Sequence, residues 1–445
     1  DYSIFLYHRY VEEKKTNEDK NDAMDVAIQK TISSIFASSL TTFAGFIVLI
    51  IMRLGLGKDI GLVMSKGVLL GLMSTIVVLP PMILVAEKLV ARFNHRIFLP
   101  SFEKTSHFVL NHKNGLFIAF LILFIPAIYG ARNTDLYYNL DRSLPQDLDS
   151  IVALNKMKKD FNMASTHFVV VDEDLSKKNI NSLVDELKDV DGVNSVLSAN
   201  SLTGLTIPDS VLPDKLKDNF TKNGYQMIMI NSKYQTASDK VNKQVDKINK
   251  IVKNHDKKGY LTGEAVLTKD LTVLSDRDFK MVNIASIIIV FIIIAIVFKS
   301  FAIPVVLISV IELAIQINMG IPFYLGQTIP FVTSIIIGVV QLGSTIDYSI
   351  LMMDRFITEY KEVNDVDQAL KLTVKETSKS IVTSALSFMA ATVGVGLYSR
   401  MEIVSTICMF LARGAIISML AIILFLPTLI KIAFPFIRKT TKGLN

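Results

Sequence analysis

Two copies of one short motif place an aspartate inside apolar sequence. Asp347 lies in GSTIDYSILMMDRF, residues 343–356, and the chain opens with the same DYSI, which begins at Asp1. A carboxylate in the bilayer core is costly, so it usually faces the interior of a helix bundle and marks an ion or proton pathway. Asp347 is therefore a candidate proton carrier. The alternative is a buried ion pair that only fixes the positions of helices.

Five further polar side chains lie in or beside apolar sequence: Tyr2, Tyr348, Lys66, Arg413 and Glu312. Each tyrosine follows an aspartate and offers it a hydroxyl group. A proton carrier must alternate between charged and neutral forms, and a nearby cation favours the charged form of a carboxyl group. Movement of Lys66 or Arg413 could therefore load and release a proton. The alternative for both cations is to reach the lipid headgroups, and Glu312 fits either a functional acid or a polar group at a helix contact.

Direct pairing of Arg413 with Asp347 meets a geometric difficulty. Counted from the outer ends of their apolar runs, the two residues differ in depth by about 10 Å at a helical rise of 1.5 Å per residue. A long side chain, a tilted helix or a bridging water could close this gap, and so could indirect pairing.

The elements that must position these residues are membrane-spanning helices. Of the 445 residues, 51% are hydrophobic, and they gather in runs of about 20, the length that crosses a bilayer core of roughly 30 Å. The sequence therefore predicts a polytopic α-helical membrane protein, with residues 1–9 as the inner end of one more span. The predicted blocks are 34–52, 60–86, 114–131, 281–298, 301–325, 329–352, 379–398 and 403–430.

The positions of basic residues predict which segments face the cytoplasm. Lys and Arg gather at 88–113 and at the C-terminus, and the positive-inside rule keeps such segments inside. Alternate threading then puts 10–30 and 355–376 inside and the polar insert 133–280 outside. Three parts follow: 1–132 with the end of a first transmembrane half and a seventh span, 133–280 as an outside domain, and 281–445 with the later spans and a basic tail.

Sliding the chain along itself by 346 positions reveals an internal repeat. The aligned pairs include Arg9 with Arg355, Glu13 with Glu359, Ser34 with Ser380, Ser38 with Ser384 and, after one inserted residue, Lys66 with Arg413. Such self-similarity indicates two related halves. Because both copies enter the membrane in the same direction, the halves are predicted to be parallel, about an axis along the membrane normal.

Two smaller features complete the organisation. Amphipathic stretches at 17–33 and 363–379 each precede a span and are predicted to lie on the membrane as interfacial helices, with a regulatory or partner-binding site as the alternative. The insert 133–280 alternates helical and extended patterns, with helices at 150–161, 177–190 and 237–255 and strands at 166–173 and 225–231. This order predicts a small α+β domain with helices on one face of a sheet.

Composition argues against other classes of function. Cys408 is the only cysteine and the six histidines lack ligand spacing, so neither a disulfide within the chain nor a metal site is expected. The net charge of +6 is located in membrane-flanking segments, so nucleic acid is not an expected partner. GLGK at 55–58 lacks the spacing of a phosphate-binding loop. No cofactor and no enzyme activity are predicted.

The motifs together resemble the RND superfamily of transporters, and more narrowly its MMPL branch, the mycobacterial-type large membrane proteins. GSTIDYSILMMDRF is the most specific element, and LTGEAVLTKDLTVLSDRDF (261–279) resembles the end of the family's outside domain. The resemblance implies a ferredoxin-like porter domain outside the membrane. It also implies a proton relay made by Asp1, Tyr2, Asp347 and Tyr348.

The resemblance further implies a function and a location. Members export lipids, amphiphiles or hydrophobic drugs across the bacterial cytoplasmic membrane at the expense of the proton gradient, so membrane lipids, a hydrophobic substrate and protons are the expected partners. A complete member has twelve spans and two outside domains, so this chain is expected to be a fragment that lacks the first three spans, the first outside domain and the start of the fourth span. A protein-export motor similar to SecDF and a lipid-sensing receptor similar to Patched stay open as alternatives, as does association of identical chains.

Overall fold

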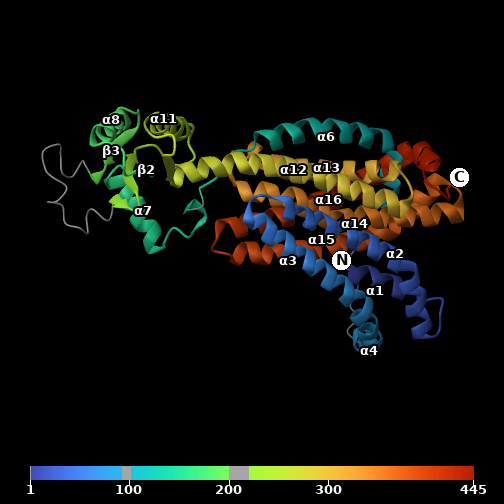
Figure 1. Cartoon of the computed structure of the whole chain (residues 1–445). Helices are drawn as coiled ribbons and strands as arrows, with labels where there is room; N and C mark the ends of the chain where they lie inside the picture. The colour runs from blue at the N-terminus through green and yellow to red at the C-terminus, as the bar shows by residue number, and fades with distance from the viewer. Residues whose placement is uncertain (1, 93–101, 140, 200–219, 445) are drawn as a thin grey trace. The chain divides into compact units, whose positions relative to one another are not determined.

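The computed structural model describes residues 2–92, 102–139, 141–199 and 220–444 (Figure 1). The chain divides into two compact units. One comprises Asp1–Leu136, Arg277–Ser399 and Ile403–Asn445, and the other comprises Tyr137–Asp276 with Arg400–Glu402. Helix α12 (Glu264–Phe298) runs without a break through the division at Arg277.

The first unit is a bundle of long helices, and eight of the described helical segments are long and apolar enough to cross a membrane. This confirms the prediction of a polytopic helical membrane protein. The remaining helices of the unit are α1 (Tyr2–Glu13), α2 (Lys20–Ile47), α3 (Gly55–Met73), α4 (Leu79–Arg92), α5 (Glu103–Asn111), α6 (Lys113–Asn133), α13 (Ala302–Tyr324), α14 (Phe331–Val363), α15 (Val366–Tyr398) and α16 (Glu402–Thr440). A short 3-10 turn, Val48–Ile51, follows α2, and a π-helical turn, Ser74–Val78, joins α3 to α4.

The helix boundaries repeat as the sequence does. Helix α2 begins at Lys20 and α15 begins at Val366, which is 346 positions later. Helix α3 begins at Gly55 and α16 begins at Glu402, 347 positions later, in keeping with the one inserted residue. Helix α1 corresponds to the second part of α14. The two halves of the repeat are therefore built from helices in the same order.

Two amphipathic stretches differ from their predicted form. Residues 20–33 are the first turns of α2 and residues 366–379 are the first turns of α15, and each helix continues without a break into the apolar sequence that follows. Asp19 caps the first of these helices, accepting hydrogen bonds from the backbone N–H groups of Asn21 and Asp22, and Asp365 caps the second in the same way through Gln368. Capped starts at these points make each polar stretch part of the long apolar helix that follows it, so neither forms a separate helix.

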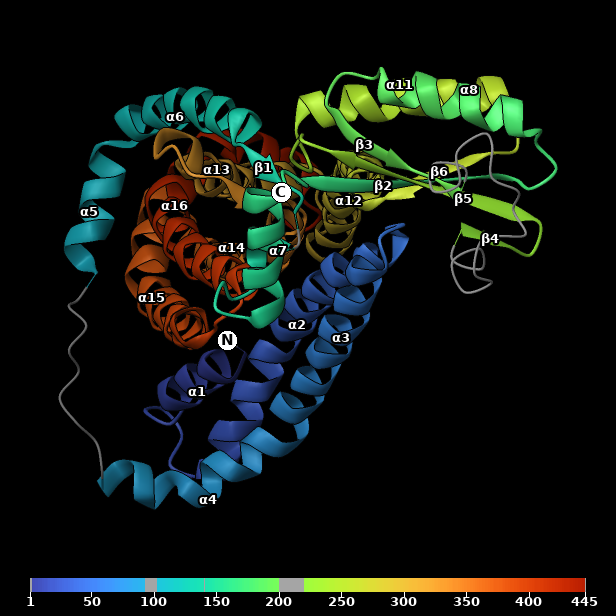
Figure 2. The ribbon, with the colours of Figure 1, turned by 90° about the vertical axis from the view of Figure 1, so that its left-hand side faces the viewer.

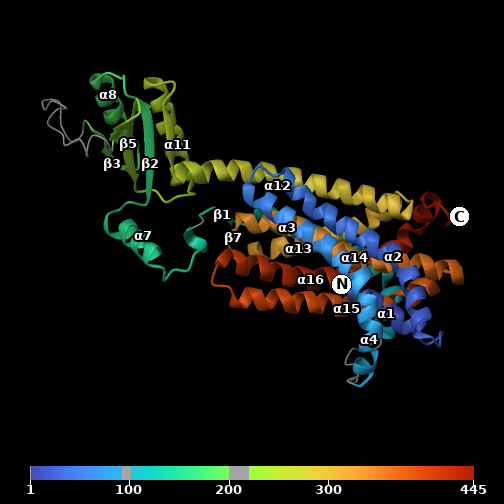
Figure 3. The same ribbon diagram turned by 60° about the horizontal axis from the view of Figure 1, so that its bottom comes forward.

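Helix α14 forms the centre of the bundle and packs closely against α2. In the most apolar stretch of α14, 83% of the residues are buried, whereas only 11% of the residues are buried in the corresponding stretch of the α3–α4 span. A methyl group added to Gly45 of α2 would lie 3.4 Å from the Cα of Gly343 on α14. Small residues at this crossing let the two backbones approach, which brings the side chains of α2 next to Asp347. Figure 3 shows α2 running beside α14.

The second unit is a small α+β domain. Its sheet has the strand order β3–β5–β2–β6 with antiparallel pairing throughout, and the short β4 pairs with β5. The strands are β2 (Ser165–Asp172), β3 (Val193–Leu197), β4 (Thr221–Lys222), β5 (Tyr225–Ser232) and β6 (Tyr260–Gly263). The helices of the unit are α7 (Asp149–Asp160), α8 (Lys177–Lys188) and α11 (Asp239–His255). The 3-10 turn Asp141–Ser143 precedes α7.

One face of this sheet is covered by α8 and α11 (Figure 2). The burial of β2 alternates from residue to residue, as expected of a strand with one face on a core. Val169 and Ile228 from the sheet pack with Leu183 from α8 and Ile248 from α11. Two further short strands, β1 (Leu136–Tyr137) and β7 (Ile329–Pro330), lie outside this sheet.

A buried histidine makes the stability of the second unit depend on pH. His167 on β2 is fully buried, and its Nε2 lies 3.3 Å from Oε1 of Gln244. Burial lowers the pKa of His167 below its ordinary value, so the unfolded chain binds more protons than the folded unit between the two pKa values. We expect the protection of amides in β2 and β5 from hydrogen exchange to fall as the pH drops from 7 to 5. The corresponding loss in the free energy of unfolding is at most about 1.4 kcal/mol for each pH unit.

Comparison with His167→Gln isolates this contribution. The glutamine does not titrate in this range, so the protection factors of the variant, after correction for intrinsic exchange, should depend less on pH than those of the parent protein. Equal pH dependence in the two proteins would contradict the role assigned to His167.

Candidate functional site

Asp347 lies on α14 at the interface with α2. Its Oδ1 is 3.3 Å from the hydroxyl oxygen of Thr42. The same hydroxyl lies 2.7 Å from the carbonyl oxygen of Gly343 and 3.0 Å from that of Ser38. The phenol of Tyr2 donates a hydrogen bond to the hydroxyl oxygen of Thr42 over 3.4 Å. A chain of polar groups therefore runs from Tyr2 through Thr42 to Asp347.

The single hydroxyl proton of Thr42 gives this arrangement two states. A hydroxyl group donates one hydrogen bond and accepts two. While Thr42 donates to the carbonyl of Gly343, a protonated Asp347 can donate to Thr42. When Asp347 is ionised, Thr42 can rotate and donate to the carboxylate instead. The site can thus offer Asp347 a hydrogen-bond partner in either protonation state.

A small cavity of about 40 Å³ adjoins Asp347. Its lining is drawn from both halves of the repeat, with hydroxyl groups on α2 matched by equivalent ones on α15. The lining residues are Tyr2, Ile4, Phe5, Ser34, Ile35, Ser38, Asp347, Tyr348, Ile350, Leu351, Ser380, Ile381 and Ser384. A volume of about 10–15 Å³ suffices for one water when polar partners are present, so the cavity has room for water beside the carboxyl group.

Three of the four predicted relay residues gather at this cavity. Tyr2, Asp347 and Tyr348 all line it, and Tyr348 is only 2% exposed. Asp1 lies outside the described residues. Thr42 was not among the predicted residues, although its bond to Asp347 joins the two halves. The repeat offered no signal for it, since position 388, its equivalent, is Phe388.

Arg413 makes its contacts away from Asp347. Its Nε donates to Oδ1 of Asn318 over 2.7 Å, and one of its terminal nitrogens donates to the Asn318 carbonyl over 2.9 Å. The guanidinium group also lies 4.3 Å from the centre of the Phe410 ring. Asn318 in turn donates to Gln341 on α14 over 2.8 Å. The cation is thus linked to α14 through two neutral amides, which differs from direct pairing with Asp347.

The other two predicted charge partners lie elsewhere in the bundle. Lys66 is exposed on α3, and the described residues place no acidic group within ion-pair distance of it. Glu312 is partly buried on α13 and has Gln316, one turn further along the helix, as a hydrogen-bonding neighbour. Within the described part of the chain, neither residue contacts Asp347.

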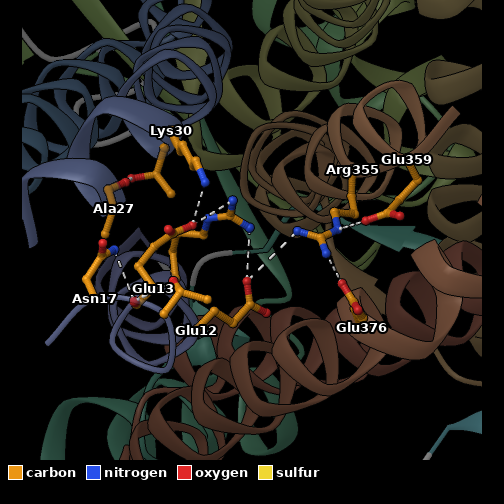
Figure 4. A network of polar contacts seen from close by, with 11 residues as sticks. Glu12, Glu13, Asn17, Ala27, Lys30, Arg355, Glu359 and Glu376 are labelled. Carbon is orange, nitrogen blue, oxygen red and sulfur yellow. Dashed lines mark hydrogen bonds and ion pairs between the residues drawn. The ribbon is translucent and has the colours of Figure 1, made fainter. Parts of the chain in front are cut away.

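A cluster of ion pairs lies two to three helical turns beyond Asp347 (Figure 4). Arg9 on α1 pairs with Glu13 over 2.9 Å, and its repeat equivalent Arg355 on α14 pairs with Glu359 over 2.8 Å. Arg355 also pairs with Glu376 of α15 and lies 3.9 Å from Glu12 of α1. The cluster therefore connects the two halves near the end of the bundle where α2 and α15 begin.

Comparison with known proteins identifies the family. The model of the MMPL family matches residues 1–99 and 142–443. The chain belongs to the MMPL family. The match covers both halves of the repeat and most of the insert, so the motif around Asp347 and the second unit lie within the family's own pattern.

Individual relatives cover the chain unevenly. Membrane protein YdfJ of Bacillus subtilis is 21% identical over 417 residues, which are 86% of this chain and 54% of the relative. Putative membrane protein ActII-3 of Streptomyces coelicolor is 34% identical over 104 residues, 23% of this chain and 14% of the relative. Probable transport protein MmpL12 of Mycobacterium tuberculosis is 21% identical over 174 residues, 38% of this chain and 15% of the relative. The chain thus spans about half the length of YdfJ and less of the others.

Proposed function

We propose that the protein to which this chain belongs exports lipids or other hydrophobic or amphiphilic molecules across the bacterial cytoplasmic membrane, driven by the inward movement of protons. The observation that carries this proposal is the position of Asp347, which contacts Thr42 across the interface between the two repeated halves. A carboxyl group there can couple its protonation state to the packing of α2 against α14. The family supports transport, because one of its relatives carries the name of a probable transport protein.

Coupling follows from the hydroxyl of Thr42. An ionised Asp347 attracts the Thr42 proton, whereas a protonated Asp347 leaves that proton to the carbonyl of Gly343, 2.7 Å away. The two states therefore differ in the hydrogen bonds that join α2 to α14 at their closest approach. Alternation between them would shift one half of the repeat against the other, as parallel-repeat transporters require. Tyr2 and Tyr348 line the cavity beside the acid.

We also propose a ferredoxin-like porter fold and an extracytoplasmic location for the second unit. Support for the fold comes from the element order β2–α8–β3–β5–α11–β6 and the sheet order β3–β5–β2–β6, which fit the split βαβ arrangement. Such a domain is suited to contact a substrate as it leaves the membrane.

Reconstitution of the complete protein in lipid vesicles tests the proposed function. An imposed pH gradient should drive both acidification of the inner compartment and movement of a fluorescent lipid between the two leaflets, and a protonophore should abolish both. Lipid movement that ignores the gradient would contradict proton coupling. Lipid binding without any movement would favour a receptor, and accumulation of precursor proteins after depletion in cells would favour a protein-export motor.

Labelling with a membrane-impermeant thiol reagent tests the location of the second unit. In a Cys408→Ala background, Lys257→Cys in the second unit should react in intact cells, because this side chain is exposed and is predicted to lie outside. Glu18→Cys in the connection between α1 and α2 is the matched control and should react only after lysis. The reverse pattern would overturn the predicted orientation.

A further inference from the structure

A second cavity opens beside the first on the side of the ion-pair cluster. It has a volume of about 240 Å³ and a strongly polar lining, and it shares Phe5, Leu351 and Ser380 with the cavity at Asp347. The lining residues are Phe5, His8, Arg9, Glu12, Lys30, Thr31, Leu351, Asp354, Arg355, Thr358, Glu362, Glu376, Thr377 and Ser380. The two cavities are therefore neighbours along α14, one small and next to Asp347, the other larger and charged.

Asp354 lies on the boundary between these cavities. It follows Asp347 by seven residues, which is two helical turns, so both carboxyl groups occupy one face of α14. The hydroxyl of Ser34 on α2 donates to Oδ2 of Asp354 over 2.7 Å. Ser34 lines the small cavity and Asp354 lines the large one. This hydrogen bond therefore connects the two spaces.

A row of hydroxyl groups on α2 lies alongside the two carboxyl groups of α14. Ser34, Ser38 and Thr42 recur every four residues and share one face of α2. Thr42 contacts Asp347 at one end of this row, and Ser34 contacts Asp354 at the other. Ser38 lies between them and lines the small cavity. Polar groups thus accompany the whole distance from one acid to the other.

We propose that Asp354 is a second proton-carrying residue, which exchanges protons between Asp347 and the large cavity through Ser34. This rests on the proposed proton-driven function. Asp347 gives its proton to a water in the small cavity, and that water passes a proton to the oxygen of Ser34. Ser34 simultaneously gives its own proton to Oδ2 of Asp354, so that each intermediate group gains one proton and loses one. Asp354 then releases its proton to water in the large cavity, which the predicted topology places on the cytoplasmic side.

Charged groups surround Asp354 from each neighbouring element. Arg9 and His8 come from α1, Lys30 from α2, and Glu376 from α15, while Arg355 and Lys361 belong to α14 itself. The cations favour the ionised form of Asp354, so a proton that reaches this carboxyl group is readily released. His8 is also the repeat equivalent of Asp354, and both line the same cavity. Both halves therefore place a titratable side chain at the same depth.

Two substitutions in the complete protein test the relay, each with a neighbouring control. Asp354→Asn keeps the hydrogen bond from Ser34 but carries no proton, and Glu362→Gln removes a different acid of the same cavity. Ser34→Ala breaks the connection, whereas Ser33→Ala changes an exposed neighbour on α2. We expect Asp354→Asn and Ser34→Ala to slow proton-driven flux in vesicles by about 10²-fold, the lower end of what a positioned proton-transfer group contributes. The controls should retain flux near that of the parent.

A kinetic measurement separates proton delivery from a purely structural role. The infrared band of protonated Asp347 is identified as the carboxyl band that is missing in Asp347→Asn. After a pH jump, this band should appear with its normal amplitude in Asp354→Asn and in Ser34→Ala, but about 10²-fold more slowly than in the parent protein. Asp354→Glu should restore much of the rate.

An unchanged rate in folded Asp354→Asn and Ser34→Ala proteins would overturn the relay, and it would leave the proposed function intact if Asp347→Asn still abolished flux. A parent protein without proton-driven flux would instead refute the proposed function itself. If Asp354→Asn fails to fold, Ser34→Ala and Asp354→Glu decide the question, because both keep the carboxylate.

Discussion

Replacement of Asp347 by Asn in the complete protein should abolish proton-driven flux while the protein still folds and inserts in the membrane. Asparagine has nearly the same size and can accept the hydrogen bond of Thr42, but it cannot take up or release a proton. We expect flux to fall by at least about 10²-fold, since positioned proton-transfer groups contribute this much or more. Vesicle flux under an imposed pH gradient, together with the melting temperature in detergent, measures both parts of the expectation.

The contacts of Arg413 sharpen this expectation. If Asp347 were the anion of a structural pair, its neutralisation would leave a buried cation unpaired, at a cost of about 3–5 kcal/mol, and Arg413→Leu would rescue the variant. Because Arg413 donates to Asn318 instead, the single variant should stay stable and the double variant Asp347→Asn/Arg413→Leu should gain nothing. Glu312→Gln, which neutralises another acid within a span, is the control. Normal flux in a folded Asp347→Asn protein would end the proposal of a proton relay.

The spanning helices were predictable because the bilayer imposes a length and a composition that a sequence displays directly. The repeat was equally visible, since helices α2 and α15 begin at positions 346 residues apart. The predicted breaks between interfacial stretches and spans were wrong for a local reason. The polar residues at 20–33 belong to the same continuous helix as the apolar residues that follow them, and composition alone does not distinguish this from a separate helix.

The site was predictable only in part. An aspartate inside an apolar run signals itself, whereas Thr42 is an ordinary residue in a stretch rich in small side chains, and its role depends on the close approach of Gly45 to Gly343. The partner of Arg413 was equally hidden, because a neutral asparagine on another helix satisfies the guanidinium group. Asp354 lies in the same conspicuous stretch as Asp347, and its seven-residue spacing was the available signal for a shared helix face.

Replacement of Arg355 by Met should be the most destabilising change in the ion-pair cluster. Arg355 neutralises Glu359, which is only 7% exposed, and also Glu376. Loss of this cation leaves both acids without an ion-pair partner among the described residues. We expect a loss of about 3 kcal/mol of unfolding free energy, the lower end of the cost of removing one partner from a buried pair. Reversible unfolding in detergent at neutral pH measures this loss, and neutralising the acids as well, with Glu359→Gln and Glu376→Gln, should recover most of it.

The repeat supplies its own control for this prediction. Arg9 is the equivalent of Arg355, and its partner Glu13 is buried to a similar degree, at 8% exposed. Glu13, however, has a second cation, because Lys30 lies 2.8 Å from it. Position 376, the equivalent of Lys30, carries a glutamate, so Glu359 has no such reserve. Arg9→Met should therefore cost clearly less than Arg355→Met, although the two arginines match in sequence. Equal losses of unfolding free energy in the two variants would contradict the role of Lys30 as a second cation for Glu13.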